Sequence, residues 1–243
     1  LWHLPTKARL FSPTVADGVA YVGGENGSLR AVSIATGRVL WQRHFDGWIY
    51  PPAIIGERLI IAGQELKLRA LRRSDGGLLW DIPLPQESVH YPVAIDDHTV
   101  VVTTFSADIL AVSVHDGSLR WQAKDTVANH SPLLIDKSLY FRTFAGPIKV
   151  RNASNGRLLW QSKTHLSTRP LRKIDKALIA VDERGQVLAL DAETGSLIKR
   201  CSEFKKTIKT PISIDNQRLI FFTGGVNPTD RLTPNVIQWV TTK

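Results

Sequence analysis

Residues 31–41 read AVSIATGRVLW, and the end of this stretch, Gly37-Arg38-Val39-Leu40-Trp41, recurs along the chain. Three further copies end in Trp80, Trp121 and Trp160, so the tryptophans are separated by 39, 41 and 39 residues. A fifth copy, Gly195-Ser196-Leu197-Ile198-Lys199, follows 39 residues later with lysine in place of tryptophan. Five copies in register indicate a repeat protein with a period of about 40 residues.

Each repeat consists of short alternating stretches of apolar and polar residues separated by turn residues, a pattern typical of β-strands. In the third repeat we expect strands at 91–95, 99–104, 109–114 and 118–121, joined by turns at 96–98 and 115–117. Four antiparallel strands in a unit of about 40 residues are typical of a β-propeller blade. No segment keeps a helical period, which disfavours parallel βαβ folds because their crossovers need helices.

The sequence therefore predicts an all-β fold, a six-bladed β-propeller of four-stranded antiparallel blades in a single domain over residues 1–243. The expected repeats span approximately 3–41, 42–80, 81–121, 122–160, 161–199 and 200–243. The last repeat has strands near 212–214, 218–222 and 236–240, and a fourth strand is missing. We expect Leu1-Trp2-His3 to supply it, because Trp2 precedes Trp41 by 39 residues and this pairing closes the ring. Alternatively, Trp239 marks the fourth strand and further blades precede the chain.

The repeated pattern Ala-x-Asp-x-x-Thr-Gly-x-x-x-Trp resembles the segment that closes each blade in propellers of the pyrroloquinoline-quinone (PQQ) type. In this motif glycine and the preceding Asp, Asn or Thr favour a hairpin turn, and the large tryptophan ring is suited to packing between blades. We therefore expect Trp2, Trp41, Trp80, Trp121 and Trp160 to be structural. The matching residues are Ala31, Thr36, Gly37 and Trp41; Ala70, Asp75, Gly76 and Trp80; Ala111, Asp116, Gly117 and Trp121; Asn155, Gly156 and Trp160; and Ala189, Asp191, Thr194 and Gly195.

Two branches of this superfamily give different expectations. Quinoprotein dehydrogenases resemble one another in an adjacent cysteine pair over the quinone, which this chain cannot form because Cys201 is its single cysteine. The BamB branch uses the same repeats without a cofactor to hold other proteins. Resemblance to that branch implies a protein-binding scaffold in a bacterial cell-envelope or secretion assembly, periplasmic or associated with the outer membrane.

Charge and composition narrow the possible partners. The formal net charge is +9, and the excess lies in the second half, where residues 122–243 hold 20 basic and 10 acidic residues. A basic surface favours an acidic partner or a polyanion, although a generally solvated surface explains it too. No apolar run reaches the length of about 18 residues that a membrane-spanning helix needs. The chain opens at Leu1-Trp2 and lacks methionine, so we expect a processed or trimmed product.

Familiar catalytic and cofactor motifs are not found in the sequence. It has no His-x-x-x-His, cysteine cluster, phosphate-binding loop or Gly-x-Ser-x-Gly, and we predict no cofactor, no metal site and no enzymatic activity. The remaining enzyme hypothesis places chemistry at the mouth of the channel. Its acid–base candidates are His90, His130 and His165.

Loops on one face of the predicted propeller are longer than those on the other face and richer in aromatic and basic residues. Loops on a rigid scaffold often carry binding sites, and this face collects aromatic and basic side chains. We expect protein-binding anchors at Trp48, Tyr50, His90, Tyr91 and Phe144, with Lys205, Lys206 and Lys209 steering charged partners. The alternative for Tyr50 and Tyr91, each followed by proline, is that they start an inner strand and line the channel.

A non-catalytic protein-binding scaffold is thus the first hypothesis for function. The alternatives are a ligand- or polyanion-binding sensor and an enzyme acting at the channel mouth. Strong loss of binding at high salt favours the polyanion hypothesis over apolar docking.

Overall fold

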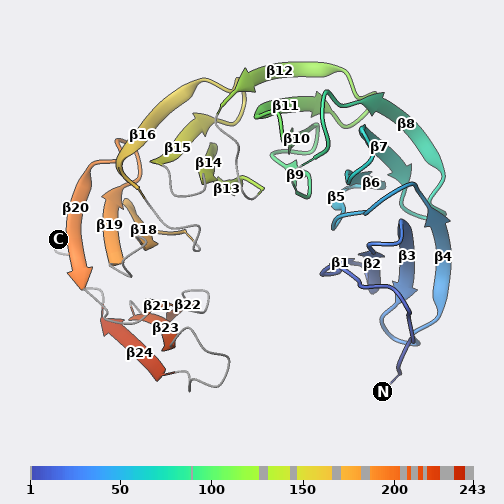
Figure 1. Ribbon diagram of the computed structural model, residues 1–243, viewed down its shortest axis with the longest axis horizontal. Helices are drawn as coiled ribbons and strands as arrows, with labels where there is room; N and C mark the ends of the chain where they lie inside the picture. The colour runs from blue at the N-terminus through green and yellow to red at the C-terminus, as the bar shows by residue number, and fades with distance from the viewer. Residues whose placement is uncertain are drawn as a thin grey trace. The chain divides into compact units, whose positions relative to one another are not determined.

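The computed structural model describes residues 2–88, 90–125, 131–142, 147–165, 171–181, 187–202, 207–208, 213–215, 218–224 and 233–238 (Figure 1). Every regular element in these ranges is a β-strand, which confirms the all-β prediction. The chain divides into two compact units, Leu1–Phe141 with Asn152–Arg157, and Arg142–Arg151 with Leu158–Lys243. Among the described residues no helix is long and apolar enough to cross a membrane.

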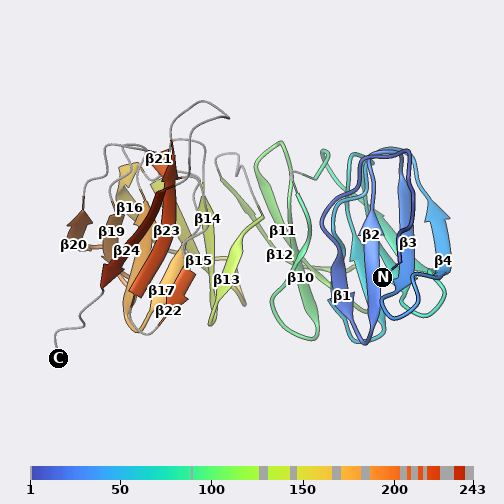
Figure 2. The same ribbon diagram turned by 90° about the horizontal axis from the view of Figure 1, so that it is seen from below.

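The first unit contains three complete sheets, each a meander in which consecutive strands pair antiparallel. Figure 1 shows β1, β5 and β9 next to one another on the inner side of these sheets and β4, β8 and β12 on the outer side, and Figure 2 shows β1 to β3 side-on. The strands are β1 (Thr14–Ala16), β2 (Val19–Gly23), β3 (Ser28–Ser33) and β4 (Val39–His44); β5 (Ala53–Ile55), β6 (Arg58–Ile61), β7 (Lys67–Arg72) and β8 (Leu78–Pro83); and β9 (Val93–Ala94), β10 (Thr99–Thr103), β11 (Asp108–Ser113) and β12 (Leu119–Lys124). A further hairpin pairs β13 (Leu133–Ile135) with β14 (Ser138–Arg142).

The second unit is built from the same kind of strands. It holds the pair β15 (Pro147–Asn152) and β16 (Leu158–His165), then a complete sheet of β17 (Arg172–Ile174), β18 (Ala177–Val181), β19 (Val187–Asp191) and β20 (Leu197–Ser202). In the last sheet, β21 (Thr207–Ile208) and β22 (Ser213–Asp215) pair with one edge of β23 (Arg218–Gly224). The opposite edge of β23 pairs with β24 (Thr233–Gln238). β22, β23 and β24 correspond to the three strands predicted for the last repeat, although β24 begins at Thr233 instead of Val236. β21 was not predicted.

The core lies between neighbouring sheets of a unit. In one cluster Tyr21 and Leu29 pack with Leu59 and Ile61 of the next sheet, and a second cluster joins the second and third sheets. Because sheets cover both of its faces, β11 is buried at every position instead of at alternate ones. Burying a leucine, isoleucine or valine side chain of β11 contributes about 1.5–3 kcal/mol to the stability of the fold.

A β-bulge occurs at the same place in each described pair of third and fourth strands. Ala31 faces Trp41 while Val32 faces Val39, so Leu40 is the extra residue of β4. A bulge interrupts the alternation of a strand. For this reason two consecutive leucines of β8, Leu78 and Leu79, are both exposed, at 56% and 39%. The register shifts in the other pairs adjoin Ala70, Ala111, Val150 and Ala189.

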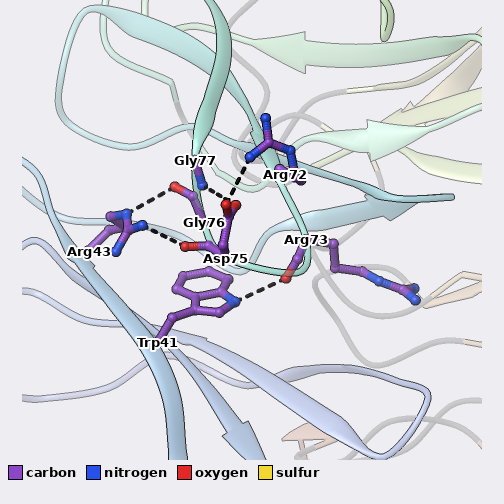
Figure 3. A network of polar contacts seen from close by, with 7 residues as sticks. All are labelled: Trp41, Arg43, Arg72, Arg73, Asp75, Gly76 and Gly77. Atoms are coloured by element: carbon purple, nitrogen blue, oxygen red, sulfur yellow. Dashed lines mark hydrogen bonds and ion pairs between the residues drawn. The ribbon is translucent and has the colours of Figure 1, made fainter.

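The fourth strands β4, β8, β12 and β16 each carry a tryptophan that reaches into the next sheet. The indole Nε1 of Trp41 donates to the carbonyl of Arg73 at 3.0 Å, and the ring lies against Gly76 (Figure 3). A Cβ added to Gly76 would come within 2.8 Å of the ring, and the φ of Gly76 is +70°. Glycine is therefore needed here both for the left-handed conformation and for the close approach of the ring.

The same contact recurs through both units. Trp80, Trp121 and Trp160 donate to the carbonyls of Val114, Ala153 and Ala192 at 3.0, 3.0 and 3.1 Å. Their rings lie against Gly117, Gly156 and Gly195. Trp2 lies in no strand, but it makes the same bond to Ile34 at 2.7 Å and contacts Gly37. The indole ring and the turn glycine of the repeat are thus two halves of one contact.

The residue before each turn glycine closes the turn with its own side chain. Asp75 Oδ1 accepts from the backbone N of Gly77 at 2.8 Å, and Asp116 Oδ1 accepts from that of Ser118 at 3.1 Å. Asn155, Thr36 and Thr194 make the same bond with their oxygens at 3.0, 3.3 and 3.3 Å. This explains why only short side chains with an acceptor oxygen occupy the position.

Asp116 makes the stability of the third sheet depend on acid pH. Hydrogen bonds from Ser118, then from Ser113, lower the pKa of Asp116 from 3.8 to about 2. A carboxyl whose pKa is depressed by folding stabilises the protein above its unfolded pKa, and this contribution is lost as pH falls towards the folded value. We expect the wild type to lose more thermal stability between pH 4 and pH 2 than Asp116→Asn, which keeps an acceptor oxygen but cannot titrate. Equal slopes of melting temperature against pH in the two proteins would contradict this assignment.

Candidate functional site

The segments that lead into the first strands are held against glycines of the preceding sheet. Ile49 is 1% exposed and forms an isolated antiparallel bridge with Gly63, and Gln64 N donates to the carbonyl of Trp48 at 3.2 Å. A Cβ on Gly63 would lie 1.7 Å from that carbonyl oxygen. Since side chains alternate along an extended segment, burying Ile49 turns Trp48 and Tyr50 the other way.

These segments assemble an aromatic row made of Phe11, Trp48, Tyr50 and His90. The ring centroid of Phe11 lies 6.0 Å from that of Trp48 and 5.3 Å from that of Tyr50, the latter pair edge to face. Tyr50 in turn lies 6.1 Å from the His90 ring. Contacts of this kind add about 0.5–1.5 kcal/mol each beyond burial. The structure thus brings together three of the anchors predicted from sequence and adds Phe11.

Burial raises the pKa of the Tyr50 hydroxyl above its usual value, and the nearby Glu87 carboxylate raises it further. Tyr50 therefore stays protonated at neutral pH and can donate a hydrogen bond. His90 is positioned from its backbone, because the buried Ser88 Oγ donates to the His90 carbonyl at 2.6 Å.

A groove of about 520 Å³ lies at the beginnings of β1, β5 and β9, next in sequence to the aromatic row. Tyr91, which is 48% exposed, lines it, and its carbonyl accepts from Ser131 Oγ at 2.7 Å. Thr14 Oγ1 donates to the carbonyl of Pro52 at 2.9 Å and ties two of the strands together. We call this the inner-strand groove; its lining is Ser12, Pro13, Thr14, Pro51, Pro52, Ala53, Ile54, Tyr91, Pro92, Val93 and Ala94.

A second repeat in the sequence marks this site. Prolines recur at 38- to 41-residue steps where the first strands begin, at Pro13, Pro52, Pro92, Pro132, Pro170 and Pro211. Proline restricts the residue before it to an extended conformation and suits the start of a strand. The residue two places before the proline is Phe11, Tyr50 or His90 in the first three repeats. Aligning the prolines would therefore have found Phe11, whereas aligning the tryptophans did not.

The other predicted site residues are placed as follows. Phe144, Lys205, Lys206, Lys209 and His130 lie outside the described residues, and His165 is the last residue of β16. Among the described residues no group of three or more His, Cys, Asp and Glu side chains is placed so that together they could hold a metal ion. What the described part offers is a rigid, mainly apolar concave surface flanked by aromatic rings, a combination suited to binding another molecule.

Comparison with known proteins connects this architecture to a family. A family model described as "Outer membrane protein assembly factor BamB" matches residues 1–145 and 88–220. Two curated relatives with that name come from Moranella endobia, 25% identical over 123 residues, and Marinobacter adhaerens, 32% identical over 108 residues. These alignments cover 45% and 44% of this chain and only 31% and 27% of the relatives.

Solved structures agree on the fold. The crystal structure of BamB from Moraxella catarrhalis superposes with a TM-score of 0.76 at 20% identity, covering 98% of this chain and 79% of that one. A quinohemoprotein alcohol dehydrogenase from Comamonas testosteroni superposes with a TM-score of 0.67 at 13% identity, covering 84% and 44%. Likeness at such identities shows the β-propeller fold alone, which is shared by an assembly factor and an enzyme. Since the family model covers most of the sequence, the chain belongs to the BamB family of PQQ-like repeat β-propellers.

Proposed function

We propose that this protein is a non-catalytic scaffold in the assembly of outer membrane proteins, acting in the periplasm at the outer membrane. The observation that carries the proposal is the family match over residues 1–220. The names of the curated relatives indicate the cellular process, since each is called an outer membrane protein assembly factor. Binding of other proteins is the activity that such a role requires.

We further propose that the whole chain is one domain of six blades, closed by its N-terminal segment. The support comes from Trp2, whose ring contacts Gly37 in the manner of the fourth-strand tryptophans and so occupies the place of an outer strand beside the first sheet. As far as it is described, the last sheet has β24 at its edge.

The partner is proposed to bind over the aromatic row and the inner-strand groove. Interfaces are enriched in tyrosine and tryptophan that are rigidly held, and a few such residues supply most of the binding energy. Trp48 is fixed by Phe11 and by the bridge at Ile49, while Tyr91 is fixed through its carbonyl and leaves nearly half of its surface free.

The test is capture of the outer-membrane assembly machinery from solubilised envelopes of the native host, with the purified chain as bait. We expect the parent to retain it and Trp48→Ala combined with Tyr91→Ala to bind at least about tenfold more weakly. The matched control is Leu78→Ala combined with Leu119→Ala, which removes two side chains that are each 56% exposed on outer strands. Because Trp48 is partly packed, Trp48→Phe and melting temperatures separate lost contact from lost folding.

The possible outcomes are distinct. Failure of the parent to capture any assembly component contradicts the proposed function. Capture that is equal for the parent and the aromatic double variant contradicts the proposed surface. Capture that 0.5 M salt abolishes for every variant instead indicates a polyanionic partner.

A further inference from the structure

Two histidines face each other at the end of the third sheet, in turns that the proposed scaffold surface does not use. His98 is the last residue of the β9–β10 turn and His115 lies in the β11–β12 turn, and both residues are exposed. His98 Nδ1 lies 3.1 Å from His115 Nε2, and the ring centroids are 5.4 Å apart with planes tilted by 35°. These turns connect the ends of the strands opposite to the start of β9, where Tyr91 lies.

The backbone holds both residues in place. Val114 N donates to the carbonyl of His98 at 3.0 Å and so joins the two turns directly. Asp96 Oδ1 accepts from His98 N at 2.8 Å, and Ser113 Oγ accepts from His115 N at 3.2 Å. The backbone positions from which the two imidazoles project are therefore fixed before any ligand arrives, which reduces the entropy lost on binding.

The pair is specific to the third sheet. The same backbone bond joins the two turns in four other sheets, from Ile34 to Gly18, Arg73 to Glu57, Ala153 to Lys137 and Ala192 to Lys176. At the position equivalent to His98 these sheets carry, in chain order, Gly, Glu, Lys and Lys. At the position equivalent to His115 they carry Ala, Ser, Ser and Glu. The repeat architecture therefore does not require imidazoles here.

The charges around the pair favour a cation. Asp96 and Asp97 precede His98 and Asp116 follows His115, giving three exposed carboxyl groups in the two turns. On β12, Arg120 Nη1 donates to Oγ1 of Thr99, the residue after His98, at 2.8 Å.

The distance between the nitrogens fits two ligands of one metal ion. Nitrogens bound at about 2.0–2.1 Å to zinc lie about 2.9 Å apart at a right angle and about 3.4 Å apart at the tetrahedral angle. The observed 3.1 Å falls between these values. Imidazole nitrogen is a preferred ligand of zinc, nickel and copper ions.

We propose that His98 and His115 chelate a divalent transition-metal ion, with Zn²⁺ as the test case, and that water completes its coordination. His98 Nδ1 and His115 Nε2 supply the lone pairs, so each ring carries its proton on the other nitrogen. Without metal, one of the two rings takes the opposite tautomer and donates a hydrogen bond to its neighbour.

Calorimetric titration of the untagged chain with zinc chloride at pH 7.5 tests the proposal. We expect one ion bound per chain, loss of that saturable binding in His98→Ala and in His115→Ala, and its retention in His44→Ala, which removes an exposed histidine from β4. In ¹⁵N spectra, zinc should shift His98 Nδ1 and His115 Nε2 and fix the stated tautomers. Absence of saturable binding by the wild type, or undiminished binding by both alanine variants with wild-type melting temperatures, would overturn the proposal.

Discussion

Trp160→Ala is expected to lower the free energy of unfolding by about 3–5 kcal/mol, the usual cost of removing a large buried aromatic ring. Trp160 is 8% exposed, its ring lies against Gly195, and its Nε1 donates to the carbonyl of Ala192 at 3.1 Å. The substitution opens a cavity between two sheets and removes the donor of a buried carbonyl. Urea unfolding followed by circular dichroism measures the effect as a lower midpoint.

Trp2→Ala is the matched control for this prediction. Trp2 makes the same hydrogen bond, to Ile34 at 2.7 Å, and the same ring contact, with Gly37, but it is 44% exposed. Because burial supplies most of the cost, we expect its loss to be less than half that of Trp160→Ala. Equal midpoints for the two variants would mean that the hydrogen bond, and not the buried ring, dominates the contact.

Gly27→Ala is expected to cost about 3 kcal/mol or more. The φ of Gly27 is +77°, and an added Cβ would come within 1.9 Å of the carbonyl oxygen of Phe45. The strain of a left-handed alanine, about 1–2 kcal/mol, then adds to a clash with backbone that cannot rotate away. The clash displaces the segment after Phe45, which leads into Trp48. The ring-current shifts of Phe11 and Tyr50 in NMR spectra should therefore change in the same variant.

Gly18→Ala isolates the strain from the clash. Its φ is +73°, nearly that of Gly27, but a Cβ there meets nothing within 4 Å. We expect a loss of about 1 kcal/mol and an unchanged aromatic row. Urea midpoints of the two variants give the comparison, and a loss at Gly18 as large as that at Gly27 would show that backbone conformation alone sets the cost.

The repeat allowed the strands to be predicted closely because strands and turns leave local marks in sequence. In the third repeat the strands predicted at 91–95, 99–104, 109–114 and 118–121 correspond to β9, β10, β11 and β12. The fourth was predicted too short, since β12 continues to Lys124. The bulge was not foreseen, because an extra residue such as Leu79 looks like ordinary alternation until its partner strand is known.

The candidate site was predictable only in part. Trp48, Tyr50 and His90 were noticed as unusual side chains in long loops, and they do lie in one row. Phe11 was missed because the repeats were aligned on their tryptophans and not on their prolines. The inner-strand groove was missed because proximity between residues about 40 positions apart depends on how the sheets pack. The pairing of His98 with His115 was missed because the two residues lie in different turns of the third sheet.

The contact between each tryptophan and a turn about 32 residues downstream gives the chain a direction. Each repeat that ends in Trp41, Trp80, Trp121 or Trp160 gives its indole to the repeat that follows. Adding or removing one such repeat as a whole therefore leaves the remaining contacts with equivalent partners. Gene duplication can therefore change the length of such a protein in complete steps without redesigning its core. A partial repeat is penalised, because it leaves a glycine turn without the ring that should cover it.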